Sequence, residues 1–142
     1  MGLLADFYIS TDDAAADYDE SDSWPEPEHA QYKNITPLEL SALWAAMRHQ
    51  EWHAWQEWQE NEFECLLNAD EGERLIYRFP PAFVSLLARL DPDALARTAE
   101  DWTETDAITW DTPDAQEVLE DIVRLARAAA ATGRHLYLWN CV

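Results

Sequence analysis

The sequence predicts an α+β fold in which helices dominate and a small sheet includes the N- and C-terminal strands. Three observations lead to this prediction: short strand-like segments lie at both ends, helix-start signals recur between them, and the composition is that of a globular chain. The 142 residues are 48% hydrophobic and include eight Trp, which is enough apolar surface for one core of moderate size. We therefore expect a single domain over residues 1–142.

The strand at the N-terminus is predicted from alternation over Leu3–Ser10. Leu3, Ala5, Phe7 and Ile9 fall on one face, the pattern of a half-buried strand. Two other short segments are rich in aromatic or branched residues and predict strands over Arg74–Phe79 and His135–Cys141. Residues 11–33 contain many acids and end the first strand, so they predict a loop segment.

Three predicted helix N-termini share one sequence pattern, in which a capping residue is followed by Pro and then by an acidic residue in the first turn. Thr36-Pro37-Leu38-Glu39 is a capping box and opens a predicted helix from Pro37 to Trp58. The same signals recur at Asp91-Pro92-Asp93 and Thr112-Pro113-Asp114. The last predicts a helix from Pro113 to Thr132 that Gly133 closes, and a shorter helix is expected over Ala82–Leu90 after two prolines.

The net charge of −20 narrows the functional classes. With 29 Asp and Glu against 9 Lys and Arg, the surface repels phosphates and anionic headgroups, so we expect neither nucleic-acid binding nor membrane binding. The chain shows no signal peptide, no apolar run long enough to span a membrane and only two cysteines, Cys65 and Cys141, which we expect to be reduced. A cytoplasmic location follows as an expectation.

The acids are concentrated in two segments, Met1–Tyr32 and Thr98–Val123, each with nine Asp or Glu and no Lys or Arg. Such segments suit a protein whose partner is basic, for example an inhibitor of a toxic enzyme or a mimic of phosphate. Helix capping, solubility and genome composition explain the same pattern without a partner. The candidate partner-binding residues are acids and Trp residues with no evident buried face: Asp12, Asp13, Asp17, Asp19, Trp24, Trp52, Glu100, Asp101, Glu104 and Trp110.

Glu51 is the candidate catalytic residue. It falls on the apolar stripe of the first long predicted helix, beside residues such as Leu43, Trp44 and Met47. An acid in that position is either paired with a base such as Arg78 or Arg124, or desolvated with a raised pKa and able to act as a general acid or base.

His49 and His53 are candidate metal ligands, because residues four apart on a helix can share a metal, with Glu57 or Glu60 within reach. The order His49-Gln50-Glu51-Trp52-His53 differs from the zinc-protease motif, and an exposed polar face explains the pair equally. No activated nucleophile and no glycine-rich phosphate loop is present, and the chain has only three Gly, so no cofactor is expected.

The second half of the chain resembles the YfbM-like family of uncharacterised bacterial proteins. The resemblance rests on Arg78-Phe79-Pro80-Pro81-Ala82-Phe83-Val84, on the segment Leu87–Leu95, and on residues Val118–Leu125 and Thr132–Trp139, with Met1-Gly2 and Leu43-Trp44 also similar. Gln50–Asp70 departs from the family pattern, being rich in Trp and Glu where the family carries a Gly-containing segment. The resemblance implies one α+β domain and no known activity, so it assigns no functional residue.

These observations favour a small cytoplasmic bacterial protein that binds a basic protein without catalysis. The alternative is an enzyme or ligand-binding protein with a pocket around Glu51 and neighbouring aromatic residues. The sequence leaves the oligomeric state open.

Overall fold

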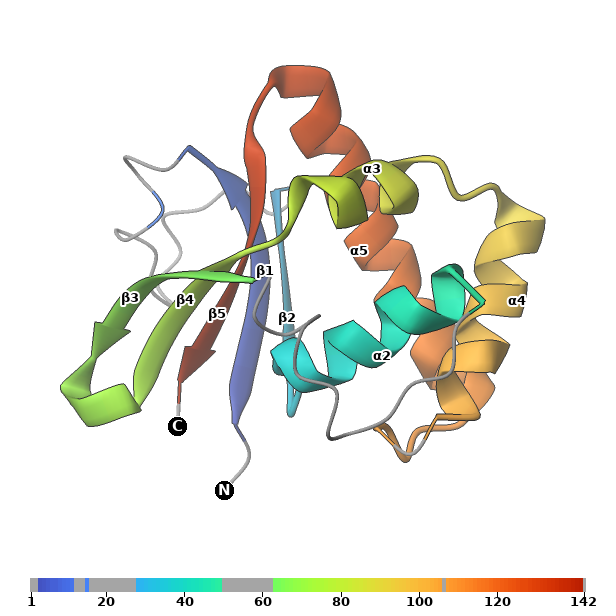
Figure 1. Cartoon of the computed structure of the whole chain (residues 1–142), viewed down its shortest axis with the longest axis horizontal. Coiled ribbons are helices and arrows are strands. Elements are labelled where there is room, and N and C mark those ends of the chain that lie inside the picture. Colours follow the sequence, from blue (N-terminus) through green and yellow to red (C-terminus); the bar gives the residue numbers. More distant parts are fainter. Residues whose placement is uncertain (1–2, 12–14, 16–27, 50–62, 106, 142) are drawn as a thin grey trace.

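The structure is a computed structural model that describes residues 3–11, 15, 28–49, 63–105 and 107–141. Its fold is α+β, as predicted. Figure 1 shows one sheet with helices packed against one of its faces. The sheet order is β2-β1-β5-β4-β3, and every neighbouring pair is antiparallel.

The strands from the two ends of the chain, β1 (Leu4–Ser10) and β5 (His135–Cys141), pair with each other along their whole length. β4 (Arg74–Arg78) completes the middle of the sheet on the other side of β5. These three strands agree with the predicted ones to within a residue at each end. The prediction that the terminal strands share a sheet is therefore confirmed.

Two further strands lie at the edges of the sheet. β2 (His29–Lys33) falls in the segment that the sequence predicts to be a loop, and β3 (Glu64–Ala69) is not predicted. The reason is visible in their burial: β2 has one buried residue and β3 has none, so neither carries the apolar alternation by which a strand is recognised.

The first strand is buried on both faces, not on one. Ala5, Phe7 and Ile9 belong to the core beneath the helices, whereas Tyr8 belongs to a second cluster on the opposite face, which Ala15, Ile76, Tyr137 and Trp139 complete. The Tyr8 hydroxyl donates to the carbonyl of Ala15 at 2.8 Å, and its ring stacks on Tyr137 with centroids 5.4 Å apart. The expectation of a half-buried strand is therefore wrong.

The helix α2 (Pro37–Met47) starts as predicted, with the full capping box of Thr36 and Glu39. It ends eleven residues before the predicted end at Trp58. Arg48 is its C-cap and His49 adopts a φ of 54°, a left-handed conformation that an α-helix does not continue through. No Gly or Pro marks this end, so the sequence carries no stop signal there.

The other helices are α3 (Pro81–Ala88), α4 (Pro92–Thr103) and α5 (Thr112–Thr132). Asp91 caps α4 as predicted, and Gly133 closes α5 with a φ of 66°. The N-cap of α5 is Asp111, one residue before the predicted Thr112, and its side chain accepts from the backbone of Asp114 at 3.1 Å. Both residues are good caps, so their order in the sequence could not decide between them.

Candidate functional site

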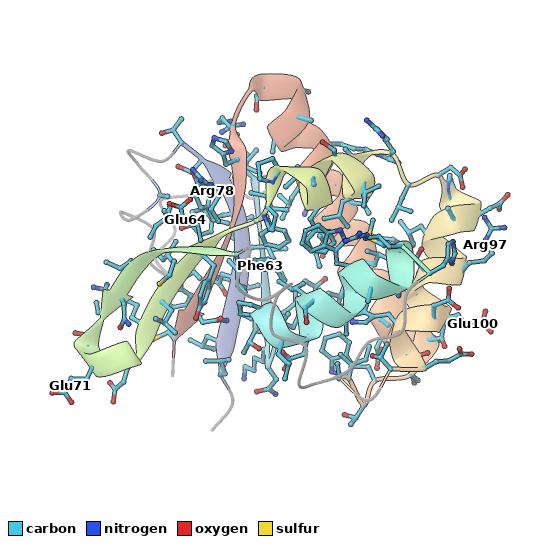
Figure 2. All side chains as sticks on the ribbon, in the orientation of Figure 1. Phe63, Glu64, Glu71, Arg78, Arg97 and Glu100 are labelled. Carbon is cyan, nitrogen blue, oxygen red and sulfur yellow. The ribbon has the colours of Figure 1, made fainter. Side chains whose placement is uncertain are left out.

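The candidate functional site is the end of the molecule where α4 ends and α5 begins. We call it the acidic end and define it by its described Asp and Glu residues: Glu100, Asp101, Glu104, Asp111, Asp114, Glu117, Glu120 and Asp121. All except Asp101 and Asp121 are exposed. In Figure 2 the Glu100 side chain points away from the body of the protein, on the outer side of α4.

A pair of tryptophans holds this end together. Trp102 is fully buried and its Nε1 donates to the carbonyl of Glu39 at 3.0 Å, which joins α4 to α2. Trp110 packs edge-on against Trp102 with ring centroids 5.3 Å apart. It is half-buried at the margin of the core, so only part of its ring is available to a partner.

The charges of the acidic end are largely uncompensated. Within the described chain, Asp121 is its one acid in an ion pair, with Arg124 at 3.3 Å. Asp111 caps α5, and Glu120 accepts from the amide of Gln116 at 3.2 Å. Glu100, Glu104 and Glu117 have no cationic partner among the described residues. The negative potential at this end is therefore directed to solvent.

The flank of the acidic end is joined to the sheet by Tyr32 of β2. The Tyr32 hydroxyl donates to Oδ2 of Asp121, across 89 residues of sequence. Burial raises the pKa of Tyr32 well above its ordinary value, and the hydrogen bond and charge of Asp121 raise that pKa further. Tyr32 thus stays protonated at neutral pH and serves as a fixed donor, not as a base or nucleophile.

An open hollow of about 400 Å³ lies along the first turns of α5, lined by Thr112, Pro113, Gln116, Glu117 and Glu120. Its two carboxylates favour a cationic occupant. Among the described residues no group of three or more His, Cys, Asp or Glu is arranged to hold a metal ion.

Most other candidate residues lie outside the described residues: Asp12, Asp13, Asp17, Asp19, Trp24, Glu51, Trp52 and His53. Their predicted roles stay predictions. Arg78 and Arg124, the bases considered for Glu51, contact Glu64 and Asp121. The predicted metal pair His49 and His53 requires one helix that runs through both residues. His49 is exposed and lies after the end of α2, so α2 does not extend through His49.

The sequence predicts neither the contact of Tyr32 with Asp121 nor that of Arg134 with Glu28. The second is bidentate, with Nη1 and Nη2 of Arg134 at 2.7 and 3.1 Å from the Glu28 carboxylate. Its partners are 106 residues apart, so no local pattern reveals the pair.

In the described part of the chain, none of the helices is long and apolar enough to cross a membrane. Both cysteines are free thiols. No family model, curated protein or solved structure matches this chain. The relationship to the YfbM-like family therefore stays a prediction.

Proposed function

We propose that this protein is a non-catalytic binding module for a basic protein and that the acidic end is its contact surface. The observation that carries the proposal is the group of exposed carboxylates with no cationic partner at the junction of α4 and α5. A basic partner that covers this end would replace repulsion among these acids with attraction.

The rigidity of the acidic end supports the proposal. The buried Trp102 and the Tyr32–Asp121 hydrogen bond fix the two helices that carry the acids. A partner therefore binds carboxylates that already lie on ordered helices, so little conformational entropy is lost when the complex forms. The hollow beside Glu117 and Glu120 offers a place for one basic side chain.

The test compares two variants of equal charge. The first carries Glu100→Gln, Glu104→Gln and Glu117→Gln, and the control carries Glu71→Gln, Glu73→Gln and Asp93→Asn, three exposed acids outside the acidic end. Affinity capture from the cells in which the protein is naturally made supplies candidate partners. The strongest basic candidate is then purified and titrated by calorimetry against the wild type and both variants, with lysozyme as an unrelated basic protein.

We expect the acidic-end variant to bind the partner at least tenfold more weakly, while the control variant stays within about twofold of the wild type. Binding should weaken as salt rises from about 0.05 to about 0.3 M, because the charges face solvent at the rim of the contact. Equal losses in the two variants, or equal affinity for lysozyme, would show that only net charge matters and would reject the proposal.

A further inference from the structure

The edge strand β3 and its hairpin are set apart from the acidic end. Figure 1 shows the β3–β4 hairpin extending beyond the part of the sheet that the helices cover. Within the described residues β3 pairs with β4 alone, so none of the described strands occupies its other side. No residue of β3 is buried, and Leu66 and Leu67 are half-buried at its centre.

A bulge in β3 changes which residues share a face. Glu64, Leu67 and Ala69 lie opposite Arg78, Ile76 and Arg74, so they point to the face away from the helices. Cys65 and Asn68 lie opposite Tyr77 and Leu75, on the helix-bearing face. The register shifts between Cys65 and Leu67, and Leu66 packs with Leu67 against the second cluster.

The bulge makes β3 self-complementary in an antiparallel pairing of two copies. An antiparallel pairing about the middle of Leu66-Leu67 sets Leu66 opposite Leu67, Cys65 opposite Asn68, and Glu64 opposite Ala69 of a second copy. Each of these pairs shares a face, as antiparallel pairing requires. Without the bulge, residues an odd number apart would point to opposite faces and this register would fail.

Charge also fits a second copy. Each end of β3 carries an acid with its own arginine: Glu64 contacts Arg78, and Asp70 lies 3.6 Å from Arg74. Figure 2 shows Glu64 and Arg78 together at one end of the hairpin, with Glu71 at the opposite tip. In the turned register Glu64 would face the small Ala69 of the second copy, whose neighbour is Arg74. Each Glu64 would then lie between two arginines.

We propose that β3 is a self-association edge, where two copies pair their β3 strands antiparallel and form one continuous ten-stranded sheet. The helices of both copies then lie on the same side of that sheet, because paired residues keep their faces. A six-residue edge is small beside the interfaces of permanent dimers, so the dimer should form only at high protein concentration.

Sedimentation equilibrium over concentrations up to about 1 mM measures the dimer. The wild type should approach twice the monomer mass, and more readily at about 0.5 M salt than at about 0.05 M, because salt screens the repulsion between two chains of charge −20. Leu66→Lys, which places a cation at the centre of the pairing, should reduce dimerisation at least tenfold. Ala96→Lys, an exposed change of equal charge on α4, should not.

Cross-linking decides the register independently, even if Leu66→Lys fails to fold. Wild-type protein is mixed with a Cys65→Ser/Asn68→Cys variant and treated with a short bismaleimide. Cys65 of one copy and residue 68 of the other should join severalfold more efficiently than in a control mixture with Cys65→Ser/Ser85→Cys. A protein that stays monomeric throughout the range, or equal cross-linking in the two mixtures, would overturn the proposal.

The two proposed interactions fail separately. The complex with a basic protein weakens with salt and depends on Glu100, Glu104 and Glu117, whereas the β3 dimer strengthens with salt and depends on Leu66. If one of the two interactions is absent, the other interaction is still measurable in the same protein.

Discussion

The hydrogen bond from Tyr32 to Asp121 supports a quantitative prediction about stability. Tyr32→Phe removes one oxygen and keeps the ring, so the packing of β2 against α5 is preserved and no cavity forms. What is lost is a hydrogen bond to a half-buried carboxylate. Such charge-assisted bonds contribute about 1.5–3 kcal/mol when well buried.

The expected loss is smaller than that maximum, because Asp121 also contacts Arg124 at 3.3 Å and is partly hydrated. We expect Tyr32→Phe to lower the free energy of unfolding by about 1–2 kcal/mol. For a chain of this length that corresponds to a decrease in Tm of roughly 3–8 °C. Urea denaturation followed by circular dichroism measures the loss, with an unchanged m-value as evidence that the folded state keeps its compactness.

The dependence of the free energy of unfolding on alkaline pH tests the same hydrogen bond a second time. The pKa of Tyr32 is raised in the folded state, so the stability linked to its protonated form is fully present below its unfolded pKa near 10 and is lost as pH rises above that value. The difference between wild type and Tyr32→Phe should therefore stay constant from pH 7 to about 9.5 and shrink above pH 10.

A double-mutant cycle with Asp121→Asn isolates the pair. The coupling energy should be about 1 kcal/mol. A coupling below about 0.3 kcal/mol, or a difference between wild type and Tyr32→Phe that does not change above pH 10, would refute the assignment of a stabilising bond.

Three other predictions follow from the packing, the backbone and the second ion pair. Leu119 of α5 is fully buried in the core, so Leu119→Ala should destabilise the protein by about 3–4 kcal/mol in urea denaturation, whereas Ala130→Ser, at an exposed position of the same helix, should change stability by less than about 0.5 kcal/mol. Glu71 adopts a φ of 59° at the hairpin tip, so Glu71→Asn should raise Tm slightly, by the equivalent of about 0.5 kcal/mol, and a fall in Tm would contradict the role of backbone strain. Arg134 lowers the pKa of Glu28 through a hydrogen bond, so Glu28→Gln should cost about 1 kcal/mol at pH 7. This difference should shrink as pH falls below the ordinary glutamate pKa of 4.5 and through the lowered pKa of the folded state, and a difference that stays constant on acidification would show that the carboxylate charge is not the cause.

The elements predicted correctly are those whose own residues carry the reason for their structure. The capping box of Thr36 and Glu39 and the αL residue Gly133 act within a few residues, so they are visible in the sequence. The strands β1 and β5 are dense in apolar residues because the middle of the sheet is buried. Their conformation therefore follows from their composition.

The elements predicted wrongly depend on partners far along the chain. β2 and β3 are extended because β1 and β4 pair with them, not because their own residues alternate. The end of α2 at Met47 depends on His49 adopting a conformation that few non-glycine residues take. The secondary-structure propensities of single residues do not predict such tertiary effects.

The candidate site divides in the same way. The charge of the acidic end is a property of composition, so counting acids between Thr98 and Val123 located it. That Trp110 is half-buried against Trp102, and that Tyr32 holds Asp121, are properties of the folded chain. Sequence reasoning therefore found the charge of this surface but not the contacts that make it rigid.

The pairing of β1 with β5 has a consequence for how the protein is made. β1 is synthesised about 125 residues before its partner β5, which corresponds to roughly 6–25 s of translation. Throughout that interval the edge of β1 that pairs with β5 has no strand beside it, while the apolar residues Phe7 and Ile9 of β1 are already present. Release of a chain truncated before His135 would leave this edge open permanently, so such products should be rapidly degraded or aggregate, even though most of the helices are complete.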